Sequence, residues 1–363
     1  MRILVLTSRY TATRDIVGED FGRQTRLFEA LKKFKHEIDF FCLDYRKFEN
    51  KDAKLHGISV SIRPFSIFHF LKFVSGLNKT LKNKKYDLLI ATSDPLWGFF
   101  GYYYAKKYKI KFLYDLHDNY ETYLTYKIPF FGVMDRKIMN KADILTTVSE
   151  SLRRKISRIR KGKIFVIENG ADLNLFKPKD RLQCRKRLKL PLEAKIIAYS
   201  GTLQKMQGLH LLIGAFDILK KDIGNLRLVL AGRIRKVKDE KLELDKDGII
   251  WLKNLSQENV VDLINAADVV VVPSPMNEFT KYCFPYKIIE YMACNADVVA
   301  TRVGDLALLV PEDSLCEPDS VNSLVNKIKS KIGSNKNQGY RRIAVGYSWR
   351  NIAKKLDAII RRN

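Results

Sequence analysis

The sequence lacks a hydrophobic run long enough to cross a lipid bilayer. Its longest apolar stretch, from Pro95 to Ala105, is well short of the roughly 20 residues that a membrane-spanning helix requires. The N-terminal segment MRILVLTS has neither a long apolar core nor a small-residue cleavage site, and it is typical of a first β-strand rather than a signal peptide. We therefore expect a cytoplasmic protein without a membrane span.

Cysteines are also scarce. The chain has five, an odd number, and they lack the paired close spacing of zinc ligands. Scattered cysteines in a cytoplasmic chain argue against a disulfide framework as well as against a metal cage. We expect reduced thiols at all five positions, Cys42, Cys184, Cys283, Cys294 and Cys316.

Acidic residues are few relative to basic ones. There are 66 Lys and Arg against 40 Asp and Glu, a formal net charge of +26, which implies a polyanionic partner such as a nucleic acid or an anionic membrane. The bases concentrate in two stretches, residues 53–86 and 151–163. In the first they stand beside Ile67, Phe68 and Leu71, a composition typical of a helix in a membrane interface. Buried helices with solvated lysines look similar, but the total charge favours peripheral docking on the inner face of the cell membrane.

What the chain does contain is an alternation of short apolar runs with helical periodicity. At 363 residues it exceeds what one hydrophobic core usually serves, so two α/β domains with parallel sheets are expected. The first predicted series of strands covers residues 3–7, 38–43, 88–92, 111–115, 144–148 and 164–167. The second covers residues 196–200, 227–231, 249–252, 269–272 and 297–300.

The domain boundaries follow from the break between the two series. Residues 171–191 contain prolines and a charged run without periodicity, which predicts a linker between domains at 1–170 and 192–345. Residues 346–363 predict a terminal amphipathic helix that packs on the first domain. In two doubly wound domains, ligands are expected where the carboxyl ends of the sheets face one another.

Several segments in order resemble the family 4 retaining glycosyltransferases, the group 1 type. They include YDLLIATSDP, LYDLHDNYET and ADILTTVSESL in the first half, and VIENGADLNLFKP at the linker. YSGTLQKMQGLHLLIGAF, ADVVVVPS and PYKIIEYMACNADVVATRVG follow in the second half, and YSWRNIAKKL at the end. The resemblance implies GT-B architecture: two Rossmann-like domains facing a cleft, with the C-terminal helix crossing back to the first.

The segment from Phe284 to Thr301 is the expected nucleotide-sugar site. A departing diphosphate needs N–H groups and cations aimed at its oxygens. Pro285 favours a helix start, which is an anion site, and Lys287 and Glu290 share one face of that helix. The resemblance gives Glu290 the ribose and Lys287 the phosphates.

The commonest family pattern is not intact. Where the first glutamate of the family's pair should stand, this chain has Tyr282, and Glu278 is a candidate substitute or a plain loop charge. Thr202 and Gln207 replace the usual Arg and Lys of the diphosphate site. Together with Gly201 they remain donor-site candidates, and the replacement cations proposed are Lys205, Arg233 and Lys281.

On the acceptor side the resemblance singles out two positions. Gly18 lies in the loop after the first strand, where a backbone close to a phosphate needs a residue without a side chain. His117, with Asp118 beside it, follows a predicted strand and resembles the family histidine that reaches the transferred sugar. The other histidines are expected to be structural or surface residues.

These features predict a hexosyl-type transferase of the EC 2.4 class. It would move a sugar from a UDP- or GDP-sugar to a lipid-linked or membrane-proximal acceptor. In this family the leaving phosphate is usually described as helping to take the acceptor proton, so no protein nucleophile, cofactor or required metal is expected. The alternatives are a GT-B enzyme that makes or epimerises a soluble sugar, and a basic nucleic-acid-binding protein, for which no recognised motif is present.

Overall fold

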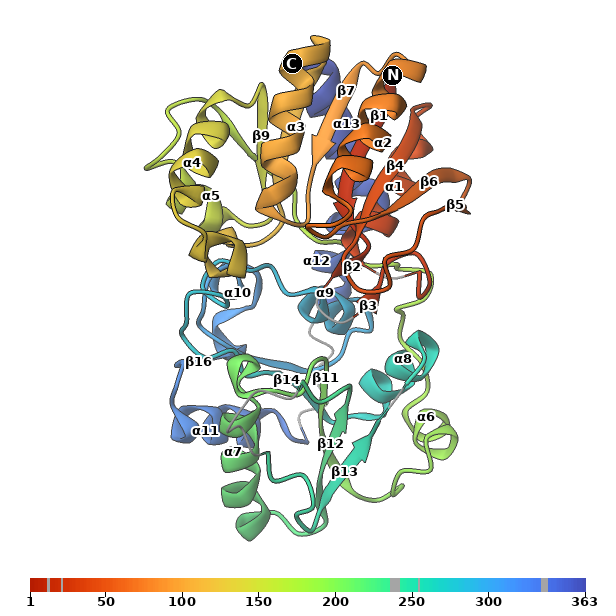
Figure 1. Ribbon diagram of the computed structural model, residues 1–363. Helices are drawn as coiled ribbons and strands as arrows, with labels where there is room; N and C mark the ends of the chain where they lie inside the picture. Colours follow the sequence, from red (N-terminus) through yellow and green to blue (C-terminus); the bar gives the residue numbers. More distant parts are fainter. Residues whose placement is uncertain (12–13, 21, 236–241, 254, 334–338) are drawn as a thin grey trace. The chain divides into compact units, whose positions relative to one another are not determined.

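The computed structural model describes residues 1–11, 14–20, 22–235, 242–253, 255–333 and 339–363. It consists of two compact units. Unit 1 comprises Met1–Asn169 and Trp349–Asn363, and unit 2 comprises Gly170–Ser348. Each unit is built around its own sheet (Figure 1).

Unit 1 contains an eight-stranded sheet in the order β10-β9-β8-β7-β1-β4-β6-β5. The pairs are parallel except for the edge pair β5·β6, which is antiparallel. Its strands are β1 (Arg2–Ser8), β4 (Glu37–Asp44), β5 (Lys51–Leu55), β6 (Ile58–Pro64), β7 (Leu88–Ala91), β8 (Lys111–Leu116), β9 (Ile144–Thr147) and β10 (Ile164–Val166). A two-stranded ribbon, β2 (Tyr10–Thr11) and β3 (Arg14–Asp15), follows β1.

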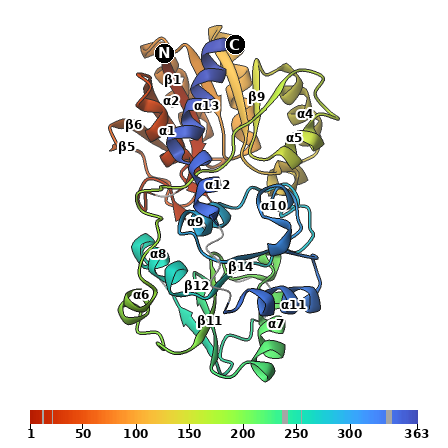
Figure 2. The same cartoon turned by 180° about the vertical axis from the view of Figure 1, so that it is seen from behind.

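Helices cover both faces of this sheet. One face carries α2 (Phe70–Asn83), α3 (Pro95–Tyr108), α4 (Phe131–Lys141) and α5 (Glu150–Ile156), as Figure 1 shows. The opposite face carries α1 (Arg23–Lys32) and the C-terminal α13 (Trp349–Arg362), which lie together in Figure 2. The imidazole Nε2 of His36 lies 2.6 Å from Asp357 on α13, and Ile352, Leu356 and Ile360 of α13 are buried. The C-terminal helix is therefore part of unit 1.

Unit 2 contains a parallel six-stranded sheet in the order β13-β12-β11-β14-β15-β16. Its strands are β11 (Lys195–Ser200), β12 (Leu226–Ala231), β13 (Ile249–Leu252), β14 (Val269–Val272), β15 (Val298–Thr301) and β16 (Leu315–Cys316). The helices are α6 (Arg181–Arg187), α7 (Leu209–Asp222), α8 (Gln257–Ala266), α9 (Tyr286–Ala293), α10 (Leu306–Leu309), α11 (Val321–Lys331) and α12 (Tyr340–Gly346). The apolar side chains Leu209, Leu212, Phe216 and Leu219 of α7 are completely buried in the core of this unit. The two-domain α/β fold class is thus confirmed.

Two segments differ from the sequence-based expectation. The predicted linker contains α6, which belongs to unit 2 and is fixed by ion pairs of Arg185 with Asp268 (2.9 Å) and of Arg187 with Asp262 (2.7 Å). The basic stretch that begins near residue 53 contains the hairpin β5–β6 before its helix, and no strand was predicted there.

Within the described part of the chain, no helix has both the length and the apolar character needed to cross a membrane. All five cysteines are thiols that form no disulfide; four of them are buried, and Cys283 is half-buried. The described residues contain no group of three or more His, Cys, Asp or Glu suited to hold a metal ion. The expectation that no metal is required stays a prediction.

Candidate functional site

The carboxyl edge of the unit 2 sheet is formed by loops that approach one another through glycines. Gly201 follows β11 and Gly232 follows β12, both with positive φ (141° and 144°). A Cβ at Gly232 would lie 1.8 Å from the carbonyl oxygen of Gly201, and one at Gly208 would lie 1.7 Å from that of Pro273. No side chain fits at these two positions, so the loops after β11, β12 and β14 are in direct backbone contact.

Lys287 lies against the first of these loops. Its helix, α9, begins directly after Pro285, as the sequence predicts. The ammonium donates to the hydroxyl of Tyr199 at 2.8 Å and lies 4.2 Å from the centre of that ring. The position of a Cβ on Gly201 would be 3.0 Å from the same nitrogen. Burial lowers the pKa of Lys287, which means that its charge is poorly solvated and that a nearby anion would stabilise it.

The rest of α9 is fixed to the end of β11. The hydroxyl of Tyr291, one turn beyond Lys287, accepts from the Ser200 N–H at 2.9 Å and lies 3.1 Å from the Ser200 hydroxyl. Burial raises the pKa of Tyr291 to about 12, so the phenol stays neutral. Glu290 lies beside Tyr291 on the same helix and is half-buried. The predicted pair of Lys287 and Glu290 therefore lies on one helix whose position is set by hydrogen bonds to the sheet.

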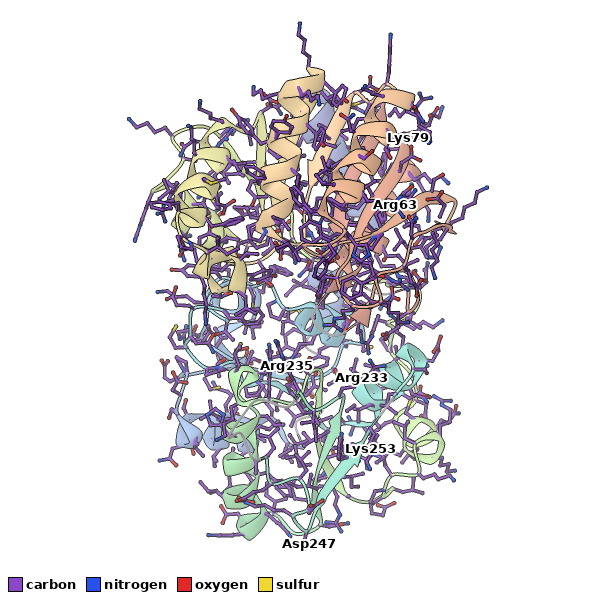
Figure 3. The ribbon with its side chains drawn as sticks, in the orientation of Figure 1. Arg63, Lys79, Arg233, Arg235, Asp247 and Lys253 are labelled. Atoms are coloured by element: carbon purple, nitrogen blue, oxygen red, sulfur yellow. The ribbon has the colours of Figure 1, made fainter. Side chains whose placement is uncertain are left out.

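Further cations lie at the same edge. Arg233 and Arg235 are exposed on the loop after β12, and Lys253 is exposed directly after β13 (Figure 3). The ammonium of Lys253 lies 5.1 Å from the ring centre of Trp251, whose Nε1–H donates to the Gly232 carbonyl at 3.0 Å. Arg235 and Lys253 were missed by the sequence analysis. Their position after a strand was the available signal, but the chain has many bases.

The remaining donor-site candidates belong to the two loops that follow β11 and β14. Thr202 is half-buried and its carbonyl accepts from the Tyr199 hydroxyl at 3.1 Å. Lys205 and Gln207 bound the short 3₁₀ helix η3 (Lys205–Gln207). Near them, the Oε1 of buried Gln204 has no hydrogen-bond partner among the described residues, so it is an acceptor for a ligand or water.

The loop after β14 is held by its own side chains. The Asn277 side chain accepts from the Phe279 and Thr280 amides at 3.0 and 2.9 Å, and its amide donates to the Met206 carbonyl at 3.2 Å. Glu278 and Lys281 are exposed on this turn, and Tyr282 is half-buried. The ammonium of Lys281 lies 5.4 Å from the Tyr282 ring centre. The turn thus brings Glu278, Lys281 and Tyr282 close together; their roles stay predictions.

His117 lies at the carboxyl edge of the unit 1 sheet, directly after β8. Its Nδ1 accepts the Ser93 N–H at 3.1 Å and lies 3.0 Å from the Tyr120 hydroxyl. A nitrogen that accepts an N–H carries no proton itself, so the proton of the neutral ring is on Nε2. Burial lowers the pKa of His117 to about 4, which keeps the ring neutral near pH 7. The side chain therefore presents one hydrogen-bond donor, Nε2–H.

Ser93, whose N–H binds His117, has an unusual backbone conformation. Its φ is 77°, in the left-handed region that a residue with a side chain rarely adopts. The Ser93 hydroxyl accepts the Ser8 N–H at 2.7 Å and the Thr7 hydroxyl at 3.2 Å, so the end of β1 fixes it. Such strain persists only where neighbouring contacts enforce it. Sequence pattern alone gives no signal for it.

Two acidic residues, Asp94 and Asp118, follow β7 and β8 at the same edge as His117. Burial raises the pKa of Asp118 to about 7, although the Tyr123 hydroxyl donates to it at 3.2 Å. Burial also raises the pKa of Asp94 to about 6; this residue caps α3 through a 2.9 Å bond from the Leu96 N–H. Two carboxyl groups that are partly protonated near neutral pH can donate or accept hydrogen bonds with hydroxyl groups.

Gly18, which was predicted to approach a phosphate, is not the glycine that directly precedes α1. The Gly18 amide, like that of Val17, donates to the Asp15 carboxylate, at 3.0 and 3.1 Å. Gly22 is instead the residue that precedes α1, with a φ of 103°. The sequence analysis did not single out Gly22, although it is a second glycine in the loop after the first strand. A phosphate contact at Gly18 stays a prediction.

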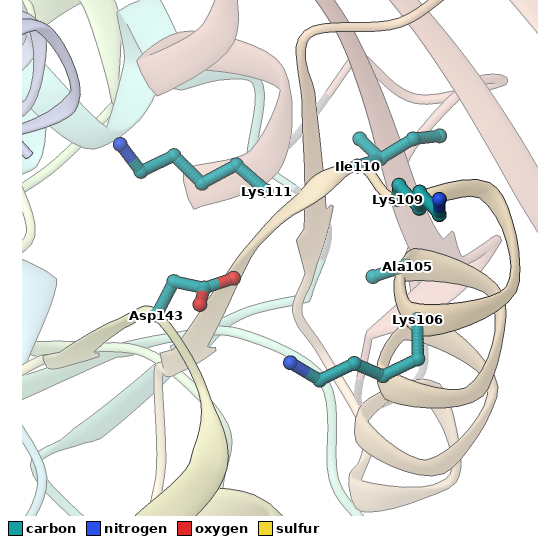
Figure 4. Close-up of a pocket in the computed structure, with 6 residues that line it drawn as sticks. All are labelled: Ala105, Lys106, Lys109, Ile110, Lys111 and Asp143. Atoms are coloured by element: carbon teal, nitrogen blue, oxygen red, sulfur yellow. The ribbon is translucent and has the colours of Figure 1, made fainter.

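A pocket of about 370 Å³ lies elsewhere in unit 1 (Figure 4). It is lined by Ala105, Lys106, Lys109, Ile110, Lys111 and Asp143. Because Lys111 begins β8 and Asp143 precedes β9, the pocket is at the amino edge of the sheet, away from His117. The Asp143 carboxylate there accepts the Phe112 N–H at 2.8 Å. We therefore do not assign this pocket to the candidate site.

Two families match consecutive parts of the chain. The family described as glycosyltransferase family 4 matches residues 25–175, and the one described as glycosyl transferases group 1 matches residues 180–344. Each match falls largely within one structural unit. Together they cover most of the segments on which the sequence resemblance was based; the terminal YSWRNIAKKL lies beyond the second match.

Individual relatives agree with this assignment. A D-inositol 3-phosphate glycosyltransferase of Corynebacterium urealyticum is 26% identical over 63% of this chain, and the alignment spans 59% of that protein's length. An uncharacterized glycosyltransferase of Methanocaldococcus jannaschii is 25% identical over 98% of this chain and 96% of its own length. The crystal structure of HepE from Anabaena in complex with UDP has a TM-score of 0.77 at 19% identity and full coverage of both chains.

The order of the two family matches repeats the order of the two sheets along the chain. The structural likeness to HepE extends over the whole chain. The fold is the one expected of GT-B enzymes. The chain belongs to the family 4, group 1 type of GT-B glycosyltransferases, enzymes of the EC 2.4 class.

Proposed function

We propose that the protein transfers a sugar from a nucleotide-diphosphate sugar, UDP- or GDP-linked, to a lipid-linked or membrane-proximal acceptor with retention of configuration. The observation that carries the donor half is Lys287. Its ammonium is half-buried, its hydrogen-bond partner is the neutral phenol of Tyr199, and its pKa is lowered by burial. A diphosphate would bring strong negative charge to this poorly solvated ammonium.

The surroundings of Lys287 support this role. The backbone at Gly201 leaves room beside the ammonium, since a Cβ there would come within 3.0 Å of it. Arg233, Arg235 and Lys253 add positive charge at the same edge, which attracts an anionic donor from a distance. UDP is the first nucleotide to test, because the similar HepE structure is a complex with UDP.

The second part of the proposal is that His117 of unit 1 contacts the transferred sugar. Its fixed Nε2–H offers a neutral donor to a sugar hydroxyl, and Asp118 beside it offers a carboxyl group. Neither group is placed as a nucleophile in this proposal. Instead, the acceptor hydroxyl attacks the anomeric carbon on the side that the diphosphate leaves. The glycosidic bond to the diphosphate breaks, the new C–O bond forms, and the acceptor proton passes to the departing phosphate.

The experiment has two steps. Thermal-shift measurements with UDP-, GDP-, ADP- and TDP-sugars identify the donor, because a ligand that binds only the folded protein raises its melting temperature. Turnover is then compared for wild type, Lys287→Ala, Glu290→Ala and the control Lys195→Ala. Lys195 is an exposed lysine at the amino end of β11, away from the proposed site.

We expect Lys287→Ala to lower kcat by about 10²–10³-fold, the usual cost of removing one donor to a developing charge. Lys195→Ala is expected to stay within about twofold of wild type. Wild-type turnover in both Lys287→Ala and Glu290→Ala would overturn the donor site. If the enzyme transfers sugar efficiently to soluble acceptors and not to lipid-linked ones, the proposed lipid-linked acceptor is wrong. The alternative, synthesis of a soluble sugar, would then take its place.

A further inference from the structure

Unit 1 exposes two apolar tips at the carboxyl edge of its sheet. The first tip consists of Ile67, Phe68 and Leu71, at the start of α2, which are 87%, 91% and 81% exposed. The second lies between β8 and the first turn of α4 and consists of exposed side chains of Leu124, Ile128, Phe130 and Val133. Apolar side chains this exposed are costly in water when they are grouped, and such groups mark interaction sites.

Both tips lie at the same edge as His117. The first precedes α2, which follows β6, and the second follows β8. Strands β6 and β8 are parallel to one another through β4, β1 and β7, so their carboxyl ends share one edge of the sheet. Four strand spacings separate them, which puts the tips roughly 20 Å apart. Their helices, α2 and α4, lie on the same face of the sheet, on either side of α3 (Figure 1).

The backbone of the second tip is arranged to expose an aromatic ring. Phe130 has a φ of 61°, in the left-handed region, and is 81% exposed at the start of α4. A bulky residue in this region is an outlier that neighbouring contacts must enforce. The next residue, Phe131, is buried against the Tyr126 ring with centres 6.1 Å apart. Because the Phe131 side chain is buried, the adjacent Phe130 side chain points into solvent.

Exposed basic residues lie near both tips in the sequence. Lys72 is exposed directly after the first tip, and Lys79 follows on the same helix (Figure 3). Lys127 is exposed within the second tip, and Arg136 and Lys137 are exposed one turn into α4. Residues 53–86, which include the whole first tip, contain no acidic residue. Apolar side chains flanked by bases match the acyl chains and anionic headgroups of a membrane interface.

We infer that unit 1 docks on an anionic lipid membrane by inserting these two tips, with the flanking bases on the headgroups. The inference rests on the proposed function, because it explains how a lipid-linked acceptor reaches the edge that carries His117 without leaving the interface. The two tips and His117 follow the carboxyl ends of strands in one sheet. Docking therefore presents that edge of unit 1 to the membrane.

The first experiment is co-sedimentation with vesicles. Wild type is compared with the triple variant Ile67→Ser, Phe68→Ser, Leu71→Ser on vesicles of phosphatidylcholine alone and of phosphatidylcholine with about 30% phosphatidylglycerol. The matched control carries Leu182→Ser and Leu308→Ser, two exposed leucines of unit 2. Serine at exposed positions leaves the core intact, and an unchanged melting temperature verifies this.

We expect wild type and the unit 2 control to bind the anionic vesicles, with affinity that falls as salt rises. The triple variant is expected to bind at least about tenfold more weakly, since three apolar side chains no longer enter the interface. Phe130→Ser is expected to weaken binding as well. Absence of wild-type binding to anionic vesicles, or equal binding by the triple variant, would overturn the inference.

Two further measurements distinguish membrane docking from dimer formation, and failure of the inference from failure of the proposed function. If size-exclusion chromatography shows a wild-type dimer that the triple variant converts to monomers, the tips form a protein interface and the inference fails. Donor binding is followed by thermal shift without vesicles, where the triple variant should equal wild type. Loss of vesicle binding with intact donor binding supports the inference, whereas absence of donor binding in wild type removes the proposed function instead.

Discussion

The groups near His117 in unit 1 differ in chemical character from those near Lys287 in unit 2. The first set includes the neutral His117 ring and the carboxyl groups of Asp118 and Asp94, whose pKa values are raised to about 7 and about 6. Unit 2 presents cations, among them Lys287, Arg233 and Lys253. The comparison teaches that similar sheets are adapted to different ligands by the residues that follow their strands. Hydroxyl groups suit the first edge, and phosphates the second.

The two edges also achieve rigidity differently, and the largest predicted effect tests this. In unit 2 the loops touch at Gly208, where no side chain fits, whereas in unit 1 Ser93 adopts a left-handed backbone conformation. Gly208→Ala is expected to lower the free energy of unfolding by about 4 kcal/mol or more, since its Cβ would overlap the Pro273 carbonyl. Urea denaturation measures this. Gly224→Ala, where nothing lies within 4 Å of the added Cβ, is the control and should remain close to wild type.

The corresponding test in unit 1 concerns Ser93. Ser93→Ala is expected to cost about 1–3 kcal/mol, because the buried Ser8 N–H loses its acceptor while the strain remains. Ser93→Gly loses the same acceptor but relieves about 1 kcal/mol of left-handed strain, so it should be the more stable variant. Denaturation of both variants decides the point. A glycine variant less stable than the alanine variant would contradict the assignment of strain to this residue.

The buried carboxyl group of Asp118 predicts a pH dependence of stability. Burial raises the pKa of Asp118 in the folded protein to about 7 from its ordinary value of 3.8, so the folded protein keeps this proton to higher pH than the unfolded chain does. Stability therefore falls as pH rises from about 4 to about 7. Asp118→Asn keeps an acceptor for the Tyr123 hydroxyl but removes this titration. Its melting temperature should exceed that of wild type by a few degrees at pH 7.5 and approach it at pH 4.5; equal pH profiles would count against the raised pKa.

The smallest effect sharpens the cationic character of unit 2. Lys253→Ala removes an exposed charge near the proposed phosphates, so KM for the donor should rise about two- to fivefold with kcat unchanged. The rise should shrink at high salt because exposed charges are screened. Lys79→Ala in unit 1 is the matched control and should leave KM for the donor unaltered. A fall in kcat for Lys253→Ala would show that it acts on the leaving group.

The sequence predicted the parallel core of both sheets, because buried strands are continuous apolar runs flanked by turns. It missed β5 and β6, since β5 is largely exposed and β6 alternates buried with exposed residues. It also read the segment containing α6 as a linker. The charges there look like a solvated loop until Arg185 and Arg187 are seen to pair with Asp268 and Asp262, more than seventy residues away.

The candidate site was predicted to a similar degree. The sequence placed Lys287 and Glu290 on one helix because a local motif determines that position, and α9 carries both residues; their roles stay predictions. Ser93 and Lys253 were not, because the backbone angle of the first and the position of the second depend on how strands align in the sheet. Gly22 was passed over for Gly18, since the true start of α1 decides between them and boundaries are the least certain part of a sequence pattern.

The glycine contacts in unit 2 also bear on how this enzyme could be redesigned. Where the backbone at Gly232 touches that at Gly201, and the backbone at Gly208 touches that at Pro273, neither insertion nor substitution can be absorbed by one loop alone. If the donor binds at this edge as proposed, we expect changes in sugar or base preference to be tolerated at side chains on the outer parts of those loops, such as Arg233 and Glu278. A library for altered donor choice should diversify those outer positions and leave the glycines unchanged.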